Sequence, residues 1–366
     1  MHYLGQMSEI PIITTQTQTE AVCDILRKKI QSGELSNDGK IPAVRKLEEM
    51  VGYPRNTVWR ALLQLKEERF VTTTPTGRYL VHPRFRHNHE GYKALKLAFV
   101  GNGNMALANP FLQRVYSCLE TNKDGFNIEI DLLLGTENKK LCAADLTPYK
   151  AVILAASWSF PFFKPLQKKN KLVTSLAAPL SYHLPSGVRI DNFHGGEVAG
   201  MAFCESEPKK IVLLGESQYY PDNWHEIFEL RALGFRRAWL QHGNPSSVIT
   251  EYPLPEDLLP RMREIEKIVA AQEEPTGYFA LSDPTAIMLL SALHDRGLRI
   301  PQDARVIGFD DSPEAAEADP PLASLCPDPQ TMAERLILQL RTMEAEPGYN
   351  KVTYVKPRLI ERASLG

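Results

Sequence analysis

The segment 39–81 constrains the fold most, because it combines two helical patterns with two short strand patterns in a fixed order. The predicted elements are a helix over 44–51, a turn at Gly52 and Tyr53, a helix over 55–68, and strands over 70–74 and 78–81 joined through Gly77. Two helices with a tight turn between them, followed by a Gly-containing hairpin, are typical of a winged helix-turn-helix.

The second predicted helix has one apolar face and a polar start. Its apolar residues at helical spacing are Val58, Ala61, Leu62 and Leu65. Arg55, Asn56 and Thr57 open the helix. In a DNA major groove, arginine can bind guanine through two hydrogen bonds, and Asn or Thr can meet an adenine edge or a thymine methyl group. The alternative is a capped, solvated helix face, but the complete order of elements favours DNA binding.

This segment resembles the DNA-binding domain of the GntR family of bacterial regulators. The resemblance is carried by Ile30-Gln31-Ser32-Gly33-Glu34-Leu35, Gly39-Lys40-Ile41-Pro42, Arg45, Leu47, Arg55-Asn56-Thr57-Val58, Ala61-Leu62 and Leu65. It implies that Arg45, Arg55, Thr57 and the wing backbone near Gly77 touch DNA. We add Asn56, Arg60 and Arg78 to the candidate DNA-binding residues, because they lie beside these positions.

The segment departs from the family at two places. The family often has arginine directly after the Thr-Val pair, whereas this chain has Trp59 there and Arg60 one position later, about 100° further around the helix. The usual Gly-x-Gly wing tip is reduced to Thr76-Gly77-Arg78. The resemblance therefore does not imply a particular operator sequence.

Length and composition predict a soluble protein of more than one domain. The chain has 366 residues, of which 43% are hydrophobic and 23% charged, so two or three cores are expected. It contains no run of about 18 apolar residues and no export signal, which predicts a cytoplasmic protein without a membrane partner. The five cysteines are far apart and lack metal-ligand spacing, so we expect reduced thiols, no metal and no cofactor.

Changes in pattern divide the chain into a winged domain over 12–82, a polar linker over 83–94 and an effector-binding domain over 95–366. His82, His87 and His89 lie in or beside the linker. They could indicate a metal site or a pH sensor, but they lack a carboxylate or cysteine partner at suitable spacing, and a solvated linker is the favoured interpretation.

From Leu95 onward, short apolar strands alternate with amphipathic helices. Strands are predicted over 95–100, 128–134, 151–155, 171–176, 188–190, 210–214, 277–281 and 305–309. Helices are predicted over 109–121, 194–204, 224–242, 260–271, 284–296 and 329–345. This alternation predicts an α/β fold with parallel sheets. Gly101-Asn102-Gly103 lacks the remaining glycine and the acidic residue of a dinucleotide site.

The same region resembles the regulatory half of the LacI/GalR family, which shares the fold of periplasmic sugar-binding proteins. The residues that carry the resemblance are Asn109-Pro110-Phe111, Ile190-Asp191-Asn192, Gly195-Gly196, Ala199, Glu229, Arg231, Gly234-Phe235, Phe279 to Asp283, Arg296-Gly297-Leu298, Ile300-Pro301, Asp303, Val306 to Asp311, Pro320-Pro321-Leu322, Leu359-Ile360, Arg362 and Ser364. It implies two lobes, the first about 95–189 with 328–345 and the second about 190–327 with 346–366.

Polar residues follow the predicted strands where an effector would bind. Ser282-Asp283 and Asp310-Asp311 each end a strand, and open α/β sheets bind ligands beyond the carboxyl ends of their strands. By resemblance, Arg231, Ser282 and Asp310 face the effector, and Asp283 is a further candidate.

Two tryptophans, Trp158 and Trp224, could stack on a sugar face. Two plainer interpretations stay open: Asp310 and Asp311 could only cap the next segment, and Trp224 could be ordinary packing.

The sequence thus predicts a bacterial transcriptional regulator that is not an enzyme, with double-stranded operator DNA and a small sugar-like effector as partners. A homodimer is expected, since one winged head reads few base pairs. Repression relieved by a sugar is the simplest mechanism, and ligand-dependent activation is the alternative. A carbohydrate-binding protein that does not bind DNA is a rival interpretation. An aminotransferase-like enzyme body is disfavoured because the chain has no room for it.

Overall fold

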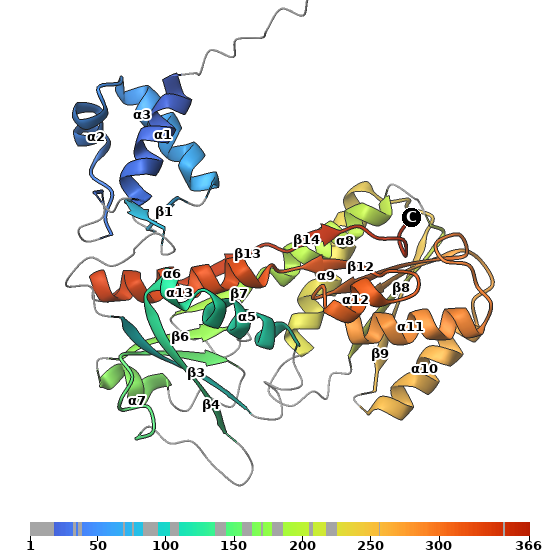
Figure 1. Cartoon of the computed structure of the whole chain (residues 1–366). Coiled ribbons are helices and arrows are strands. Elements are labelled where there is room, and N and C mark those ends of the chain that lie inside the picture. The colour runs from blue at the N-terminus through green and yellow to red at the C-terminus, as the bar shows by residue number, and fades with distance from the viewer. Residues whose placement is uncertain are drawn as a thin grey trace, which may run out of the picture. The chain divides into compact units, whose positions relative to one another are not determined.

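The computed structural model describes residues 18–31, 34–35, 39–68, 70–74, 77–82, 94–102, 110–135, 144–155, 163–169, 171–177, 186–204, 208–216, 225–255, 257–346 and 348–366. The chain divides into two units: a small one of Met1–Ala94 with the short segment Asp124–Asn127, and a larger one of the remaining residues (Figure 1). The N-terminal part, up to Ala94, is here called the head, and the part from Leu95 onward is called the body.

The head is a winged helix-turn-helix, as the sequence predicts. Its elements are α1 (Gln18–Gln31), α2 (Val44–Val51), α3 (Arg55–Glu67), β1 (Val71–Thr73) and β2 (Tyr79–Val81). The two strands pair antiparallel and place Val71 opposite Val81. Apolar faces of the three helices form one core that includes Leu26, Leu47 and Leu62. Gly52 ends α2 at φ 72°, a left-handed conformation that glycine adopts without strain.

One lobe of the body contains a parallel sheet made of six described strands, in the order β13-β7-β6-β5-β3-β4. The strands are β3 (Leu95–Asn102), β4 (Ile128–Gly135), β5 (Ala151–Ala155), β6 (Leu172–Leu176), β7 (Gly187–Ile190) and β13 (Val352–Val355). Its helices are α5 (Pro110–Thr121), α6 (Lys123–Phe126), α7 (Phe163–Lys168) and α13 (Pro329–Ala345). Every residue of the central strand β5 is buried, as expected for a strand covered on both faces.

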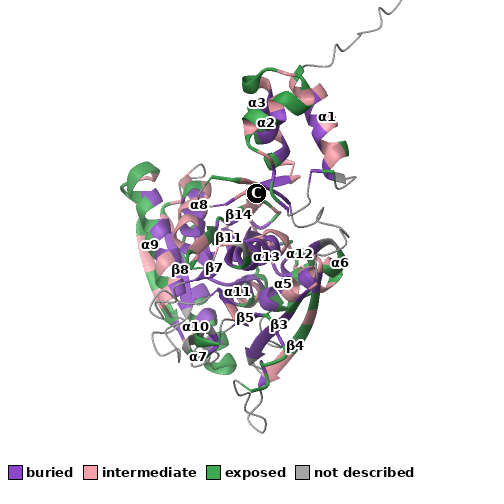
Figure 2. Cartoon of the chain, turned by 90° about the vertical axis from the view of Figure 1, so that its left-hand side faces the viewer, coloured by how far each residue is buried: buried purple, intermediate pink, exposed green. Residues whose placement is uncertain are grey.

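The other lobe has a second sheet of six described strands, in the order β14-β12-β11-β10-β8-β9, in which β14 alone is antiparallel to its neighbour. The strands are β8 (Lys210–Glu216), β9 (Val248–Leu254), β10 (Thr276–Ala280), β11 (Ala304–Phe309), β12 (Ala323–Cys326) and β14 (Arg358–Ile360). Its helices are α8 (Asn192–Cys204), α9 (His225–His242), α10 (Leu258–Ala270), α11 (Asp283–Asp295) and α12 (Pro313–Glu317). Burial is concentrated in the inner strands β10, β11 and β12, whereas α9 and α10 expose their outer faces (Figure 2).

The described strands cross between the lobes three times, after β7, after β12 and after β13. This corrects one predicted boundary. The segment 346–366 was expected to belong entirely to the second lobe, but β13 pairs with β7 in the first sheet and only β14 joins the second. Short strands of this kind carry little sequence signal, because their sheet is chosen by tertiary pairing.

Candidate effector and DNA sites

A buried arginine, Arg231 of α9, lies at the carboxyl ends of β10 and β11. Its Nε donates to Oδ1 of Asn192 at 2.9 Å, and one terminal nitrogen donates to the carbonyl of Leu281. Its other terminal nitrogen lies 3.5 Å from Oδ1 of Asp310. The guanidinium carbon stands 3.5 Å from the centre of the Phe309 ring, close enough for a cation–π contact. These contacts from α8, β10 and β11 fix the guanidinium next to the partly exposed Asp310 carboxylate.

Glycines bring α9 close enough to α8 for this arrangement. A Cβ at Gly196 would lie 1.9 Å from the carbonyl oxygen of Arg231, and one at Gly234 would lie 1.9 Å from the carbonyl oxygen of Phe193. Neither position can hold a larger residue unless the helix backbones separate. Gly196 and Gly234 therefore determine how closely α9, and with it Arg231, packs against α8.

Asp310 and Asp311 adopt unusual backbone conformations at the end of β11. Their φ angles are 106° and 49°, which strain residues other than glycine. Asp310 N donates to the carbonyl of Leu325 at 2.8 Å, and Asp311 Oδ1 accepts from Arg362 at 2.6 Å. The cap of the following helix, α12, is Ser312, whose hydroxyl accepts from Ala315 N. The capping role considered for the two aspartates is therefore filled by another residue.

Asp283 is placed differently from the sequence expectation, because its side chain is fully buried. One carboxylate oxygen accepts from Ser312 N and the other from the Ser324 hydroxyl, each at 2.6 Å. A Cβ at Gly308 would lie 2.3 Å from Asp283 Oδ1, so this strand passes directly over the carboxylate. Burial, assisted by the negative charge of Asp310, raises the pKa of Asp283 to about 7. Direct contact of Asp283 with an effector is at odds with this position. The residue instead connects the start of α11 to the loop after β11 and to strand β12.

Ser282 is also buried, at the N-cap position of α11, where its hydroxyl donates to Oγ1 of Thr285 at 3.2 Å.

Arg114, which was not predicted as a site residue, reaches the same strand ends from α5 of the first lobe. It donates to the carbonyls of Asp310, at 3.2 Å, and Asp311. Asn192 was also missed as a site residue, although it follows the end of β7 by two residues, as Ser282 follows the end of β10. No comparable signal marks Arg114. Trp158 and Trp224 lie outside the described residues.

On the head, the candidate DNA-binding side chains gather around the N-terminal ends of α2 and α3. Arg45, Arg55, Asn56 and Arg60 are exposed, and Thr57 is half-buried. The backbone N–H of Arg55 donates to the Glu48 carboxylate at 3.1 Å, which joins the two helices at their turn.

The wing is held by a tight turn. Thr74 N donates to the carbonyl of Arg78 at 2.8 Å, and Gly77, at φ 83°, donates to the carbonyl of Thr74 at 2.9 Å. Gly77 and Arg78 are exposed at its tip.

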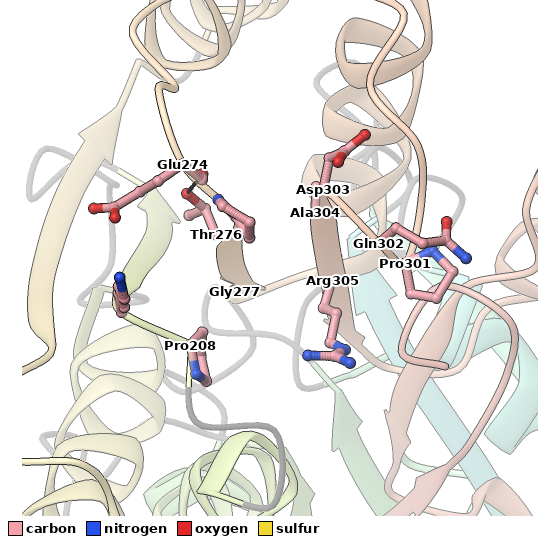
Figure 3. A pocket seen from close by; sticks show the side chains of 11 residues that line it. Pro208, Glu274, Thr276, Gly277, Pro301, Gln302, Asp303, Ala304 and Arg305 are labelled. Atoms are coloured by element: carbon pink, nitrogen blue, oxygen red, sulfur yellow. Dashed lines mark hydrogen bonds between the residues drawn. The ribbon is translucent and has the colours of Figure 1, made fainter.

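A cavity of about 320 Å³ lies at the opposite, amino edge of the second sheet, away from Arg231. It is lined by residues that precede or begin β8, β10 and β11, including Lys209, Gly277 and Arg305. The side chains of Glu274, Asp303 and Arg305 point in different directions, so these charges do not converge on one ligand atom (Figure 3).

The described residues contain no cluster of His, Cys, Asp and Glu suited to a metal ion. Among the described helices, none is both long and apolar enough to cross a membrane.

Two family models match the two units. Residues 18–81 match the bacterial regulatory proteins of the gntR family, and residues 202–365 match a periplasmic binding protein-like domain. The chain joins a GntR-type head to a periplasmic-binding-protein-like body. Both halves of the suspected resemblance, and the predicted fold class, are thereby confirmed.

Known proteins similar to this GntR-headed chain include transcriptional repressors. The "Ribose operon repressor" of Haemophilus influenzae is 30% identical over 102 residues, which are 28% of this chain and 31% of the relative. The chain thus spans about a third of that protein's length.

Solved structures show the same body fold. A lac repressor dimer bound to operator and the anti-inducer ONPF has a TM-score of 0.60 at 14% identity and covers 75% of this chain and 95% of that one. A periplasmic binding protein/LacI transcriptional regulator from Alkaliphilus metalliredigens, complexed with D-xylulofuranose, has a TM-score of 0.56 at 20% identity and covers 74% and 98%.

Proposed function

We propose that this chain is a transcriptional regulator that binds operator DNA through the head and a sugar or related small carbohydrate beside Arg231 in the body. Repression relieved by the carbohydrate is the simplest mode of action. The observation that carries the effector site is the fixed guanidinium of Arg231 next to the Asp310 carboxylate, whose side chain is 29% exposed. A cation and a carboxylate held side by side can bind neighbouring sugar hydroxyls through charge-assisted hydrogen bonds.

The position of this site between strand ends also suits a switch. Arg114 of the first lobe bonds the backbone of Asp310 and Asp311 in the second. An effector that binds Asp310 would change the surroundings of a contact between the lobes, and a ligand shifts a conformational equilibrium when it favours one arrangement. A homodimer in the cytoplasm, without enzymatic activity, is part of the proposal, since two heads can read a two-fold operator.

The effector site is tested with a panel of sugars and the full chain. A sugar that binds should raise the Tm of the wild type, because binding to the folded state alone stabilises it. We expect Arg231→Ala to weaken the calorimetric affinity of that sugar at least tenfold, as buried charged hydrogen bonds contribute about 1.5–3 kcal/mol. Arg237→Ala, which removes an exposed arginine of the same helix, is the matched control. Equal affinities in both variants would remove Arg231 from the site.

A carbohydrate-binding protein that does not act on DNA is the alternative function. The exposed polar start of α3 speaks for DNA contact. Selection of duplexes from a random pool by the full chain separates the two: a regulator enriches a sequence, whereas the alternative enriches none.

A further inference from the structure

The exposed face of α3 carries one large aromatic side chain, Trp59. Half of its surface is exposed. The core of the head is built from other α3 residues, such as Val58 and Leu62, and does not include Trp59. Tryptophan is usually well buried in folded proteins, so a half-exposed one on a binding helix is a candidate contact residue.

Helical geometry places Trp59 on the same face as Arg55, because four residues correspond to about one turn. Both side chains are exposed, and Arg55 opens the helix. In a helix-turn-helix, residues of the first turns of the second helix reach base edges in the major groove. Trp59 therefore lies one turn after Arg55 on the side of α3 that would face the groove.

The chemistry of an indole differs from that of the arginine common at this place in the resembled family. It carries no charge to neutralise a phosphate, and its single N–H donates one hydrogen bond. Its main contribution is apolar area. The major groove presents one apolar group in its base code, the 5-methyl group of thymine.

We propose that Trp59 reads a thymine of the operator by packing on its 5-methyl group, and so determines operator specificity. The inference rests on the proposed DNA-binding function of the head. The proposed partner of Trp59 is DNA. If a second head or another protein covered the ring instead, removal of thymine methyl groups from the operator would not change the binding affinity.

The test replaces thymine by uracil, which removes only the methyl group. The full chain first selects duplexes from a random pool, and each thymine of the enriched site is then replaced by uracil in turn. For the wild type, one replacement per half-site should weaken binding about three- to tenfold at fixed salt. For Trp59→Ala, the same replacement should change affinity by less than about 1.5-fold, so that the two changes are not additive.

Leu63→Ala is the matched control, since Leu63 lies one turn further along α3 and is 36% exposed. It should keep the full sensitivity to the methyl group. Circular dichroism checks that the variants keep their helices. Trp59→Arg gives an independent measurement: it should lose the methyl sensitivity and steepen the slope of log affinity against log salt by about 1, through one added phosphate contact.

Two failures can be told apart. If no duplex is enriched, DNA binding itself is wrong, and the role of Trp59 falls with it. If a duplex is enriched but wild type and Trp59→Ala respond equally to uracil at every position, the role of Trp59 alone is overturned.

Discussion

At the scale of single residues, the body buries Asp283, a carboxylic acid whose pKa is strongly raised. The carboxylate accepts two hydrogen bonds that lower its pKa. Burial and the nearby negative charge of Asp310 raise the pKa by more than these bonds lower it. The balance leaves a buried group near half-protonation at neutral pH. Its role is structural, since it links the loop after β11 to strand β12 through Ser312 and Ser324.

A pH dependence of stability follows. The pKa of Asp283 rises from an ordinary 3.8 to about 7 on folding, so between these values the unfolded chain has lost the proton that the folded chain keeps. Folding therefore becomes less favourable as pH rises through this window, and the effect is complete above it. We expect the Tm of the wild type minus that of Asp283→Asn to fall from about pH 4 to about pH 7 and then to level off.

The comparison within one series of buffers cancels the titrating groups that do not interact with Asp283. A difference that instead increases with pH would mean that the hydrogen bonds from Ser312 and Ser324 outweigh burial.

At the scale of elements, the packing of α8 against α9 positions the proposed effector site. The contact depends on glycines, and the space at each glycine differs. A Cβ at Gly196 meets the backbone of Arg231 at 1.9 Å, whereas at Gly200 the nearest atom is the carbonyl oxygen of Phe235 at 2.8 Å. An added methyl group would therefore clash more severely at Gly196 than at Gly200, although both lie on the same helix.

Gly196→Ala should lower the free energy of unfolding by about 2–3 kcal/mol, since the helices must separate. It should also weaken effector binding, because the displaced backbone is that of Arg231. At Gly200 the clash is smaller and is partly offset by the higher helix propensity of alanine, worth about 1 kcal/mol, so Gly200→Ala should lower the free energy of unfolding by less than Gly196→Ala does. Urea unfolding and calorimetry measure both. Equal losses would show that helix separation is not the cause.

The sequence predicted the elements with strong periodicity and missed those defined by their neighbours. Helix α2 and helix α13 have the predicted bounds, and the predicted apolar residues of α3 are all buried. Strands β9, β12, β13 and β14 were not predicted. Strand β9 is an edge strand in which all residues but Leu254 are exposed or half-buried, so it lacks the apolar run of a central strand.

The site shows the same division. Local pattern marked Ser282, Asp283 and Asp310 as strand ends, and resemblance marked Arg231. The burial of Asp283 depends on β11 passing over it, and the reach of Arg114 depends on how two lobes meet. Both are long-range facts that spacing along the chain does not encode.

At the scale of the whole molecule, the proposed function requires coupling between effector and operator. Such coupling is reciprocal: an effector that lowers operator affinity by some factor has its own affinity lowered by the operator by the same factor, typically about 5- to 150-fold. Titrations in both directions should give one factor.

Arg114→Ala should reduce that factor, because Arg114 bonds the second lobe at Asp310 and Asp311. Gln113→Ala, at an exposed neighbouring position of α5, serves as control. A coupling factor that is unchanged in Arg114→Ala would show that the signal passes between the lobes by another route.

The late return of the chain to both sheets has a consequence for biosynthesis. Strand β13 completes the described order of the first sheet and β14 that of the second, yet both are translated after α13, whereas the head is encoded before Leu95. At about 5–20 residues per second, the ribosome needs roughly tens of seconds to travel from the head to these strands. During that interval a nascent chain can present a folded head while its effector domain is still unfinished. Under the proposed function, each newly made molecule passes through a stage in which its DNA-binding head is complete but the molecule cannot yet respond to its signal.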